Sequence, residues 1–388
     1  MKALIIHTRR TGLGLIRSLG KKRVKVYSAD EYKSPGFYSR YVTKGYLIPN
    51  IISEGEDVFV KKMMQIGSEI GSSEKVFLFT SSDNYLIIIS KYWHLLSKYF
   101  ISVSETNEEK LLDNLYKDRM YKIAESANVN HPRTQYSNNI NYENLSFPVV
   151  IKPSIRKTSN SDVGESVFKI KKCKDKSELV DAISLLEKNN SSFVVQDFIP
   201  GDDDQLFTVG LYALKGEVIA AASARKIRQF PPLVGEGSFG ELVNEPLAIE
   251  EANKYIKKSG ISGICQLEFK RYHGKHFLME INPRPWSWNS IIDYAGINLP
   301  YIACKTILNP TSKILYRQKK YKGTWVFSLM DFKYHVLLNK NISIVRFFYN
   351  VFFSSKHAYL DFKDPLPLIS ALLQFLKKPI QSFGGKSN

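Results

Sequence analysis

A short polar run around residue 280 constrains the fold of this chain more than any other feature of its sequence. The segment Leu278–Pro285 contains a carboxylate at Glu280, an amide at Asn282 and a guanidinium at Arg284. Side chains alternate between the two faces of an extended strand, so these three groups point to the same side. The arginine can hold a phosphate by its planar fork. The run therefore predicts a polar site along one face of a strand.

A second carboxylate is expected beside this run. Glu268 lies in the apolar stretch Ile264–Lys270, and the residues that follow, Arg271–Lys275, are typical of a hairpin turn. The hairpin folds Glu268 back toward Glu280 on the neighbouring strand. Two carboxylates and the Asn282 amide oxygen suit Mg²⁺ or Mn²⁺, because Mg²⁺ prefers oxygen ligands and takes its remaining ones from water and substrate phosphates. The sequence thus predicts Glu268, Glu280 and Asn282 as metal ligands, and the alternative is an exposed hairpin with ordinary polar residues.

Three further segments fit the same kind of site. Phe147–Pro153 reads as a buried strand that ends near a lysine, Lys152, and Asn114–Arg119 carries Lys117 just before a helix. Phe193–Asp204 runs from an apolar strand into a turn with three consecutive aspartates. Together, and in this order, these segments and the Glu-Ile-Asn-Pro-Arg run resemble the ATP-grasp superfamily, which includes D-alanine–D-alanine ligase, biotin carboxylase and D-aspartate ligase. The resemblance spans about three quarters of the chain.

The resemblance assigns roles to particular residues. It implies that two lysines bind the phosphates of ATP and that the backbone of the segment after residue 193, the hinge, pairs with adenine. An acidic residue just after the hinge glycine is expected to hold the ribose hydroxyls, by position Asp203, with Asp204 as the close competitor. The residues expected to bind ATP are Lys117, Lys152, Gln196, Asp197, Phe198, Ile199, Asp203 and Asp204.

The loop that follows the lysine strand departs from the pattern. In many relatives it is rich in glycine and folds over the triphosphate, with its backbone N–H groups around the phosphate oxygens. Here Ser154–Ser166 contains one glycine and is polar and basic. A mobile lid with Arg156, Lys157 and hydroxyl groups as donors is one interpretation. A surface loop without a catalytic role is the other.

Strand and helix patterns alternate in the N-terminal part of the chain, which indicates a doubly wound parallel sheet. Three short apolar runs have the character of buried strands: Ala3–His7, Val24–Ser28 and Val76–Thr80. The run Thr11–Gly14 lacks the third glycine of a dinucleotide fingerprint, since Arg17 stands in its place, so its glycines are expected to serve the turn into a helix. The resemblance implies that this domain helps to bind the non-nucleotide substrate. Ser81–Asp83, at the carboxyl end of a strand, is therefore a candidate contact to it.

A basic cluster follows the apolar strand predicted at Val218–Ala222. Arg225 and Lys226 are expected at the end of this strand, where a basic pair can hold the γ-phosphate or a substrate carboxylate during phosphoryl transfer. Arg284, Arg225 and Lys226 are therefore the predicted catalytic residues, and the alternative for the pair is a solvated strand end. The run from Arg225 to Pro232 resembles the D-aspartate-ligase-like branch of the superfamily, which indicates carboxylate–amine ligation.

These segments together predict an α/β chain with the ATP-grasp fold. A doubly wound parallel-sheet domain is expected at residues 1–110, followed by two α+β lobes that enclose ATP. The smaller lobe, with a helical lead-in, is expected at 111–200, the larger one, with the metal site, at 201–310, and a helical, basic and aromatic-rich extension at 311–388. A chain of 388 residues is long for one domain and sufficient for two or three.

The C-terminal extension carries more than half of the net positive charge. From Thr311 to Asn388 there are 13 Lys or Arg and 3 Asp or Glu, a net charge of +10 out of the formal +18 of the chain. No apolar run approaches the ~20 residues needed to span a bilayer. Basic, aromatic-rich amphipathic segments can instead lie on an anionic membrane surface, and packing on the catalytic body or on a second subunit is the alternative. No nucleic-acid partner is expected, because no groove-reading motif accompanies the charge.

The remaining composition bears on location. The three cysteines, Cys173, Cys265 and Cys304, show no metal-binding spacing, so we expect buried small hydrophobic residues in a reducing cytoplasm. The first apolar run is too short for a signal peptide. A cytoplasmic protein is therefore predicted, with the basic extension allowing a peripheral position on the inner face of the membrane.

The predicted function is an ATP- and Mg²⁺-dependent carboxylate–amine ligase that forms an amide through an acyl phosphate. Phosphorylation of the carboxylate supplies the leaving group, so no side-chain nucleophile is required. Small-molecule carboxylate and amine substrates are expected, with a role in modifying cell-surface polysaccharide or peptidoglycan precursors, and an oligomer is compatible with the sequence. The alternatives are an ATP-grasp carboxylase or kinase that uses bicarbonate or a hydroxyl substrate, and a non-catalytic nucleotide-binding protein at a membrane surface.

Overall fold

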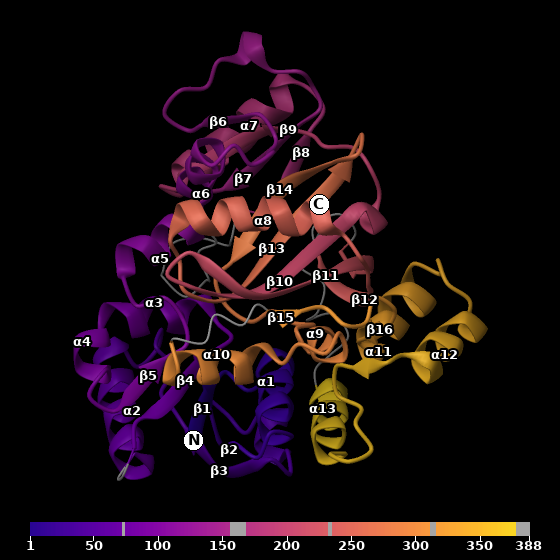
Figure 1. Cartoon of the computed structure of the whole chain (residues 1–388). Helices are drawn as coiled ribbons and strands as arrows, with labels where there is room; N and C mark the ends of the chain where they lie inside the picture. Colours follow the sequence, from indigo (N-terminus) through magenta and orange to yellow (C-terminus); the bar gives the residue numbers. More distant parts are fainter. Residues whose placement is uncertain (72–73, 156–167, 232–234, 311–315, 378–388) are drawn as a thin grey trace.

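The computed structural model describes residues 1–71, 74–155, 168–231, 235–310 and 316–377. Three sheets follow one another along the chain (Figure 1). The N-terminal sheet has the strand order β3-β2-β1-β4-β5, and every pair in it is parallel. Its strands are β1 (Lys2–Ile6), β2 (Lys25–Asp30), β3 (Val42–Leu47), β4 (Val76–Thr80) and β5 (Phe100–Ser102), and the helices between them are α1 (Arg10–Gly20), α2 (Glu56–Ile70), α3 (Asp83–Lys91) and α4 (Trp93–Leu96).

This sheet confirms the doubly wound α/β arrangement and the three strands predicted in it, which shift by two residues at most. The sequence pattern did not indicate β3, because only Tyr46 among its six residues is buried and the strand therefore shows no apolar run. The prediction for the glycines of Thr11–Gly14 is wrong. They lie inside α1, where a Cβ on Gly12 would stand 2.6 Å from the His7 carbonyl oxygen and one on Gly14 would stand 2.8 Å from Asn289 Oδ1. Both glycines thus allow close packing rather than a turn.

The second sheet is smaller and has the order β6-β9-β7-β8, with antiparallel pairs. Two helices lead into it and a third packs on it, burying a separate apolar core between helix and sheet. The strands are β6 (Thr134–Tyr136), β7 (Val149–Pro153), β8 (Lys171–Cys173) and β9 (Phe193–Asp197), and the helices are α5 (Glu108–Leu115), α6 (Lys117–Ser126) and α7 (Lys176–Lys188).

The third sheet is the largest and runs in the order β14-β13-β10-β11-β12-β16-β17, with β15 paired to β11. One of its faces packs on α6 and α8. The other face shares a core with the N-terminal sheet, through α1, α9 and α10. Its elements are β10 (Leu206–Leu214), β11 (Glu217–Phe230), β12 (Glu236–Leu242), α8 (Pro246–Ser259), β13 (Gly263–Tyr272), β14 (Lys275–Asn282), α9 (Ser290–Tyr294), α10 (Leu299–Leu308), β15 (Tyr316–Arg317), β16 (Thr324–Val326) and β17 (Lys356–His357).

The C-terminal extension is not purely helical, in contrast to the prediction. Its short strands β15, β16 and β17 join the large sheet, so the extension continues that lobe and does not form a separate appendage. Between and after these strands lie α11 (Ser328–Asp331), a π-helical turn η4 (Phe332–Leu338), α12 (Ile344–Phe353) and α13 (Leu366–Lys377), drawn in orange and yellow in Figure 1. The three cysteines are buried and free, as expected.

Candidate active site

The hairpin of β13 and β14 places the two predicted metal-binding carboxylates opposite each other. Glu268 pairs with Glu280 in the antiparallel register. The turn between the strands consists of His273 and Gly274, both with positive φ, which matches the right-handed twist of a tight hairpin. The predicted approach of Glu268 to Glu280 is confirmed, but the turn alone does not set their pairing. A β-bulge next to Glu268 shifts the register by one residue from the one that the turn sets, and this shift brings the two carboxylates opposite each other.

A hydrogen-bonded chain of side chains lines the same face. Asn282 Nδ2 donates to Gln266 Oε1 at 3.1 Å, and Gln266 Nε2 donates to Glu268 Oε1 at 2.9 Å. Arg284 Nη2 donates to Asn282 Oδ1 at 3.3 Å. Gln266 was missed by the sequence reasoning, although it stands two residues before Glu268 and so shares its face. It holds the Asn282 amide so that the amide oxygen faces Arg284.

Lysines from other strands and helices approach the two carboxylates. Lys226 Nζ lies 2.8 Å from Glu268 Oε1, and Lys117 Nζ lies 3.6 Å from Glu280 Oε1. Burial would raise the pKa of Glu280, but Lys117, Lys169 and the other nearby lysines outweigh it and lower this pKa to about 2. Glu280 is therefore ionised throughout the neutral range.

Lys152 contributes a buried cation near Lys117 and Glu280. It lies on β7, and its side chain is 3% exposed. No carboxylate among the described residues forms an ion pair with its Nζ. Burial, followed by the charge of Lys117, lowers the pKa of Lys152 to about 7, while Glu280 acts in the opposite direction. A buried cation without a paired anion is suited to an anionic ligand, because such a ligand removes the cost of the uncompensated charge.

The hinge residues follow β9, next to β7. Gln196 is buried and its Nε2 donates to Thr134 Oγ1 at 2.8 Å, while its Oε1 has no hydrogen-bond partner among the described residues. The predicted hinge residue Asp197 instead forms a 3.2 Å ion pair with Arg133. Ile199, just beyond the strand, is half-buried. The hinge therefore presents mostly backbone and one unsatisfied amide oxygen.

Two lysines flank the aromatic ring of the hinge. Lys172 Nζ lies 3.8 Å from the centre of the Phe198 ring, and Lys270 Nζ lies 5.5 Å from it. Lys270 is buried on β13, two residues beyond Glu268, and burial lowers its pKa, although Asp203 and Asp202 act in the opposite direction. Lys270 was not singled out from the sequence, although it stands at the spacing that puts it on the Glu268 face.

The structure separates the two competing ribose candidates. Asp203 is half-buried and its Oδ1 accepts a 2.8 Å hydrogen bond from Gln229 Nε2. Asp204 is exposed and accepts from Gln205 of the same turn at 3.0 Å. Because Gln229 and Lys226 lie on one strand and contact each other at 3.5 Å, Asp203 is linked to the lysine that pairs with Glu268. The geometry thus favours Asp203.

The predicted basic pair does not form. The strand β11 continues to Phe230, so Arg225 and Lys226 lie in mid-strand and point to opposite faces. Lys226 faces Glu268, whereas Arg225 stands opposite Glu241 and donates to it from Nε at 3.0 Å. The expectation that Arg225 works beside Lys226 is therefore wrong.

Comparisons with known proteins agree with this geometry. A family model described as "ATP-grasp in the biosynthetic pathway with Ter operon" matches residues 189–328. The D-aspartate ligase of Enterococcus faecium is 24% identical over 309 residues, 74% of this chain and 72% of the ligase. Among solved structures, the L-amino acid ligase from Bacillus licheniformis has a TM-score of 0.58 at 16% identity, covering 79% of this chain and 74% of its own. The N5-carboxyaminoimidazole synthetase from Staphylococcus aureus, complexed with ADP, has a TM-score of 0.63 at 14% identity, covering 88% and 85%.

Residues 189–328 of the chain thus match an ATP-grasp family. The fold class is the one that the sequence predicted. The predicted lid, Ser154–Ser166, lies outside the described residues except for Ser154 and Ile155. Ser154 closes the lysine strand by accepting a 2.9 Å hydrogen bond at its carbonyl oxygen from the Lys117 backbone N–H. That bond places the two predicted phosphate-binding lysines on adjoining segments.

An ion pair joins the N-terminal part of the chain to the segment that follows β14. Arg284 Nε and Nη2 bind the two carboxylate oxygens of Asp83 at 2.6 and 2.8 Å, in bidentate geometry. Ser81, on the same loop, hydrogen-bonds to the His7 ring at 2.9 Å. Burial, then the charge of Arg9, lowers the pKa of His7 to about 3, so its imidazole is neutral at physiological pH. Of the expected substrate-side residues Ser81–Asp83, Asp83 thus binds Arg284, whereas Ser81 contacts His7.

A second ion pair borders this junction and was not found from the sequence. Glu236, at the start of β12, pairs with Arg10 of α1. The Arg10 charge is the main cause that lowers the pKa of Glu236, and Arg284 contributes in the same direction. The pair joins segments 226 residues apart, so no local pattern could indicate it.

Proposed function

We propose that this chain is an ATP- and Mg²⁺-dependent carboxylate–amine ligase that joins its substrates through an acyl phosphate. The observation that carries the proposal is the opposition of Glu268 and Glu280 in the register of β13 and β14. Lysines from three separate elements surround this pair: Lys226 of β11, Lys117 of α6 and Lys152 of β7. The names of the relatives, D-aspartate ligase and L-amino acid ligase, support the ligase chemistry.

The donor set fits a hard divalent cation and a triphosphate. Two carboxylates and one amide oxygen suit Mg²⁺ or Mn²⁺, which take their other ligands from phosphates and water. The described residues contain no cluster of three or more His, Cys, Asp and Glu side chains that would bind a metal without such help. We propose Glu268, Glu280 and Asn282 as the metal-binding residues. Bound there, Mg²⁺ would neutralise phosphate charge and polarise the γ-phosphoryl group.

The protein groups position the nucleotide and offset its charge. Lys117 and Lys152 are proposed to bind the phosphates, and the hinge backbone around Gln196 the adenine. Asp203, with Gln229 behind it, is proposed to hold the ribose hydroxyls. These groups are held by the sheet before the ligand arrives, so they cost little reorganisation during the reaction.

Arg284 is proposed to guide the substrate carboxylate. A carboxylate oxygen attacks the γ-phosphorus, ADP leaves, and an amine then attacks the acyl carbon and expels inorganic phosphate. Arg284 lies between Asn282 and Asp83, so it links the metal-binding strand to the N-terminal domain where the substrate is expected. Its guanidinium stays protonated, because Asp83 offsets the effect of burial and raises its pKa.

A trapping assay tests this function. The chain is incubated with Mg²⁺, ATP, hydroxylamine and a panel of carboxylates that begins with D-aspartate, and hydroxamates and ADP are measured by mass spectrometry. A hydroxamate formed together with ADP is the expected result, because hydroxylamine attacks acyl phosphates in place of the amine. The assay therefore works although the natural amine is not known. Glu280→Gln should abolish the product. The matched control Glu241→Gln makes the same change on the opposite face of the same sheet and should keep it.

A second candidate is an ATP-grasp carboxylase, favoured by the similarity to N5-carboxyaminoimidazole synthetase over 88% of the chain. ADP release that requires bicarbonate, without any hydroxamate, would select it, and a product that keeps the phosphate would select a kinase. We also propose a role in polysaccharide or peptidoglycan-precursor modification, a cytoplasmic location, an oligomer and the division into four domains.

A further inference from the structure

Helix α12 turns its apolar side to solvent. Its exposed apolar residues recur three and four positions apart, which is one face of a helix: Val345, Phe348, Tyr349, Phe352 and Phe353. Val345 is 76% exposed and Phe352 is 78% exposed. The inward side buries Phe347 and the polar Asn350. A helix on the surface of a soluble protein normally does the reverse, so this face lacks its partner.

Helix α13 shows the same inversion. Its exposed apolar side chains again form one stripe: Leu366, Ile369, Leu372, Leu373 and Leu376. The side toward the protein carries the small residue Ala371 and the buried Pro367. Both helices contact η4, α12 through Phe347 and α13 through Phe375, and Figure 1 shows them in the same lower right part of the view. Single exposed apolar residues are common on protein surfaces, but two stripes on neighbouring helices indicate an interaction site.

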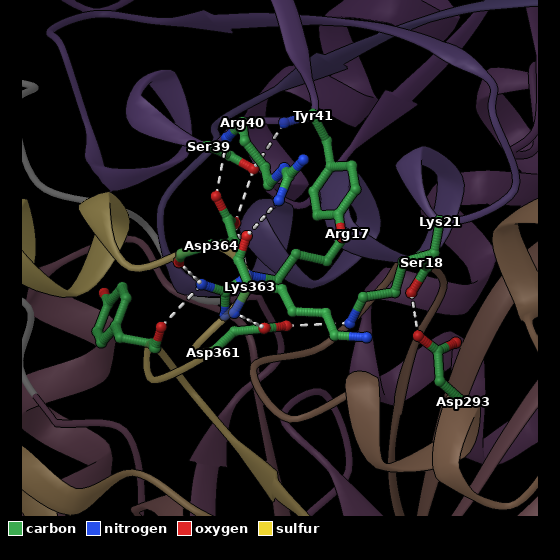
Figure 2. A network of polar contacts seen from close by, with 11 residues as sticks. Arg17, Ser18, Lys21, Ser39, Arg40, Tyr41, Asp293, Asp361, Lys363 and Asp364 are labelled. Carbon is green, nitrogen blue, oxygen red and sulfur yellow. Dashed lines mark hydrogen bonds and ion pairs between the residues drawn. The ribbon is translucent and has the colours of Figure 1, made fainter.

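A buried polar network holds α13 in this orientation (Figure 2). Asp364, just before the helix, is 1% exposed and accepts hydrogen bonds from Arg17 Nε at 2.9 Å and from Ser39 Oγ and the Arg40 backbone N–H at 2.8 Å each. Arg17 also donates from Nη2 to the Tyr359 carbonyl oxygen at 2.8 Å. Rolling α13 inward would break these bonds and leave a buried charge unpaired, which is costly. The outward stripe is therefore a property of the fold.

The charged side chains that the C-terminal extension exposes to solvent near the two helices are basic. All three acids between Thr311 and Asn388 are turned inward: Asp331 pairs with Arg228, Asp361 with Lys21 and Asp364 with Arg17. Arg346 lies on α12, and Lys340 and Lys363 lie a few residues before α12 and α13; all three are exposed. The apolar stripes are thus accompanied by exposed positive charge.

We infer that the face formed by α12 and α13 docks on an anionic lipid bilayer, with its apolar stripes at the acyl boundary and its basic residues at the headgroups. Both features match an interfacial amphipathic helix. A second copy of the chain is a poorer partner, because a two-fold interface would set this basic face against itself. Every helix of the described residues is too short or too polar to cross a bilayer. This inference does not depend on the proposed ligase activity.

Vesicle flotation with the full chain tests the inference. Binding should be strong to vesicles that contain phosphatidylglycerol, weak to pure phosphatidylcholine, and reduced by salt. Phe352→Ser and Phe353→Ser should each lower the partition constant by about tenfold or more, because each removes a large exposed apolar group. Lys340→Gln and Arg346→Gln should each lower it by about fivefold. The control Leu247→Ser, which removes an apolar residue 54% exposed on α8, should leave it unchanged.

Two further measurements distinguish insertion of α12 into the bilayer from association of the chain with a second copy. A tryptophan introduced by Phe352→Trp should be quenched by lipids with brominated acyl chains, since residue 352 is expected at the acyl boundary. Equal binding to both vesicle types, or the same loss with Leu247→Ser, would overturn the inference. So would light scattering that shows a dimer which Phe352→Ser converts to monomers, because the stripe would then be covered by a second copy.

Discussion

The buried Lys152 leads to a specific expectation for nucleotide binding. Its side chain is 3% exposed and its pKa is lowered to about 7, mainly by burial and then by Lys117. A bound triphosphate would add negative charge beside its Nζ and raise the pKa back toward that of an ordinary lysine. ATP binding should therefore be coupled to proton uptake by Lys152.

The size of this uptake follows from the lowered pKa. With a pKa of about 7 in the free protein, Lys152 should take up about 0.1 proton at pH 6, about 0.5 at pH 7 and about 0.9 at pH 8. The same shift affects stability. Because the unfolded chain binds a proton at this lysine up to a pKa near 10.5 and the folded chain only up to about 7, stability rises as the pH rises through that interval. At pH 7 the buried lysine costs on the order of 4 kcal/mol.

Calorimetry in buffers of different ionisation enthalpy measures the uptake when Mg²⁺ and a non-hydrolysable ATP analogue are added. Lys152→Arg is the matched control, since arginine stays protonated and should remove the pH-dependent part. Lys152→Met should weaken binding of the analogue while raising the free energy of unfolding at pH 7. Proton uptake that is the same in the wild type and in Lys152→Arg, or a Lys152→Met protein less stable than the wild type, would refute the reasoning.

Three further predictions concern other parts of the chain. Asp364→Asn should lower the free energy of unfolding in urea by about 3–5 kcal/mol, because it leaves the buried Arg17 without its partner charge; a change below 1 kcal/mol would contradict this. Gly210→Ala should lower the melting temperature and cost about 1–3 kcal/mol, since its Cβ would stand 2.1 Å from the Trp286 ring; unchanged stability would mean that the ring can move away. Burial lowers the pKa of His7 to about 3, so stability should fall as the pH drops below about 6.5, and the imidazole NMR shifts of His7 should stay constant from pH 8 to 5; a titration midpoint near 6.5 would exclude this.

The hairpin shows what a single sequence can predict. The approach of Glu268 to Glu280 depends on a short turn, which is local, so it was predicted correctly, whereas the β-bulge that brings the two residues into register was not predicted. The N-terminal parallel sheet followed in the same way from apolar runs separated by helical spacing. The edge strand β3 was not predicted, because an exposed strand has no apolar run.

The sequence by itself thus determined the buried strands of the N-terminal sheet, the hairpin turn and the ATP-grasp resemblance, because these depend on short-range periodicity and on motifs a few residues long. Only the tertiary structure decided that Lys226 faces the cleft while Arg225 faces Glu241, and that Arg284 binds Asp83, a residue 201 positions away in the chain. It also decided which way the amphipathic helix α12 points. The periodicity of a helix shows that it has an apolar face, but whether that face is buried or exposed depends on distant contacts that hold the backbone, and these form only when the whole chain folds.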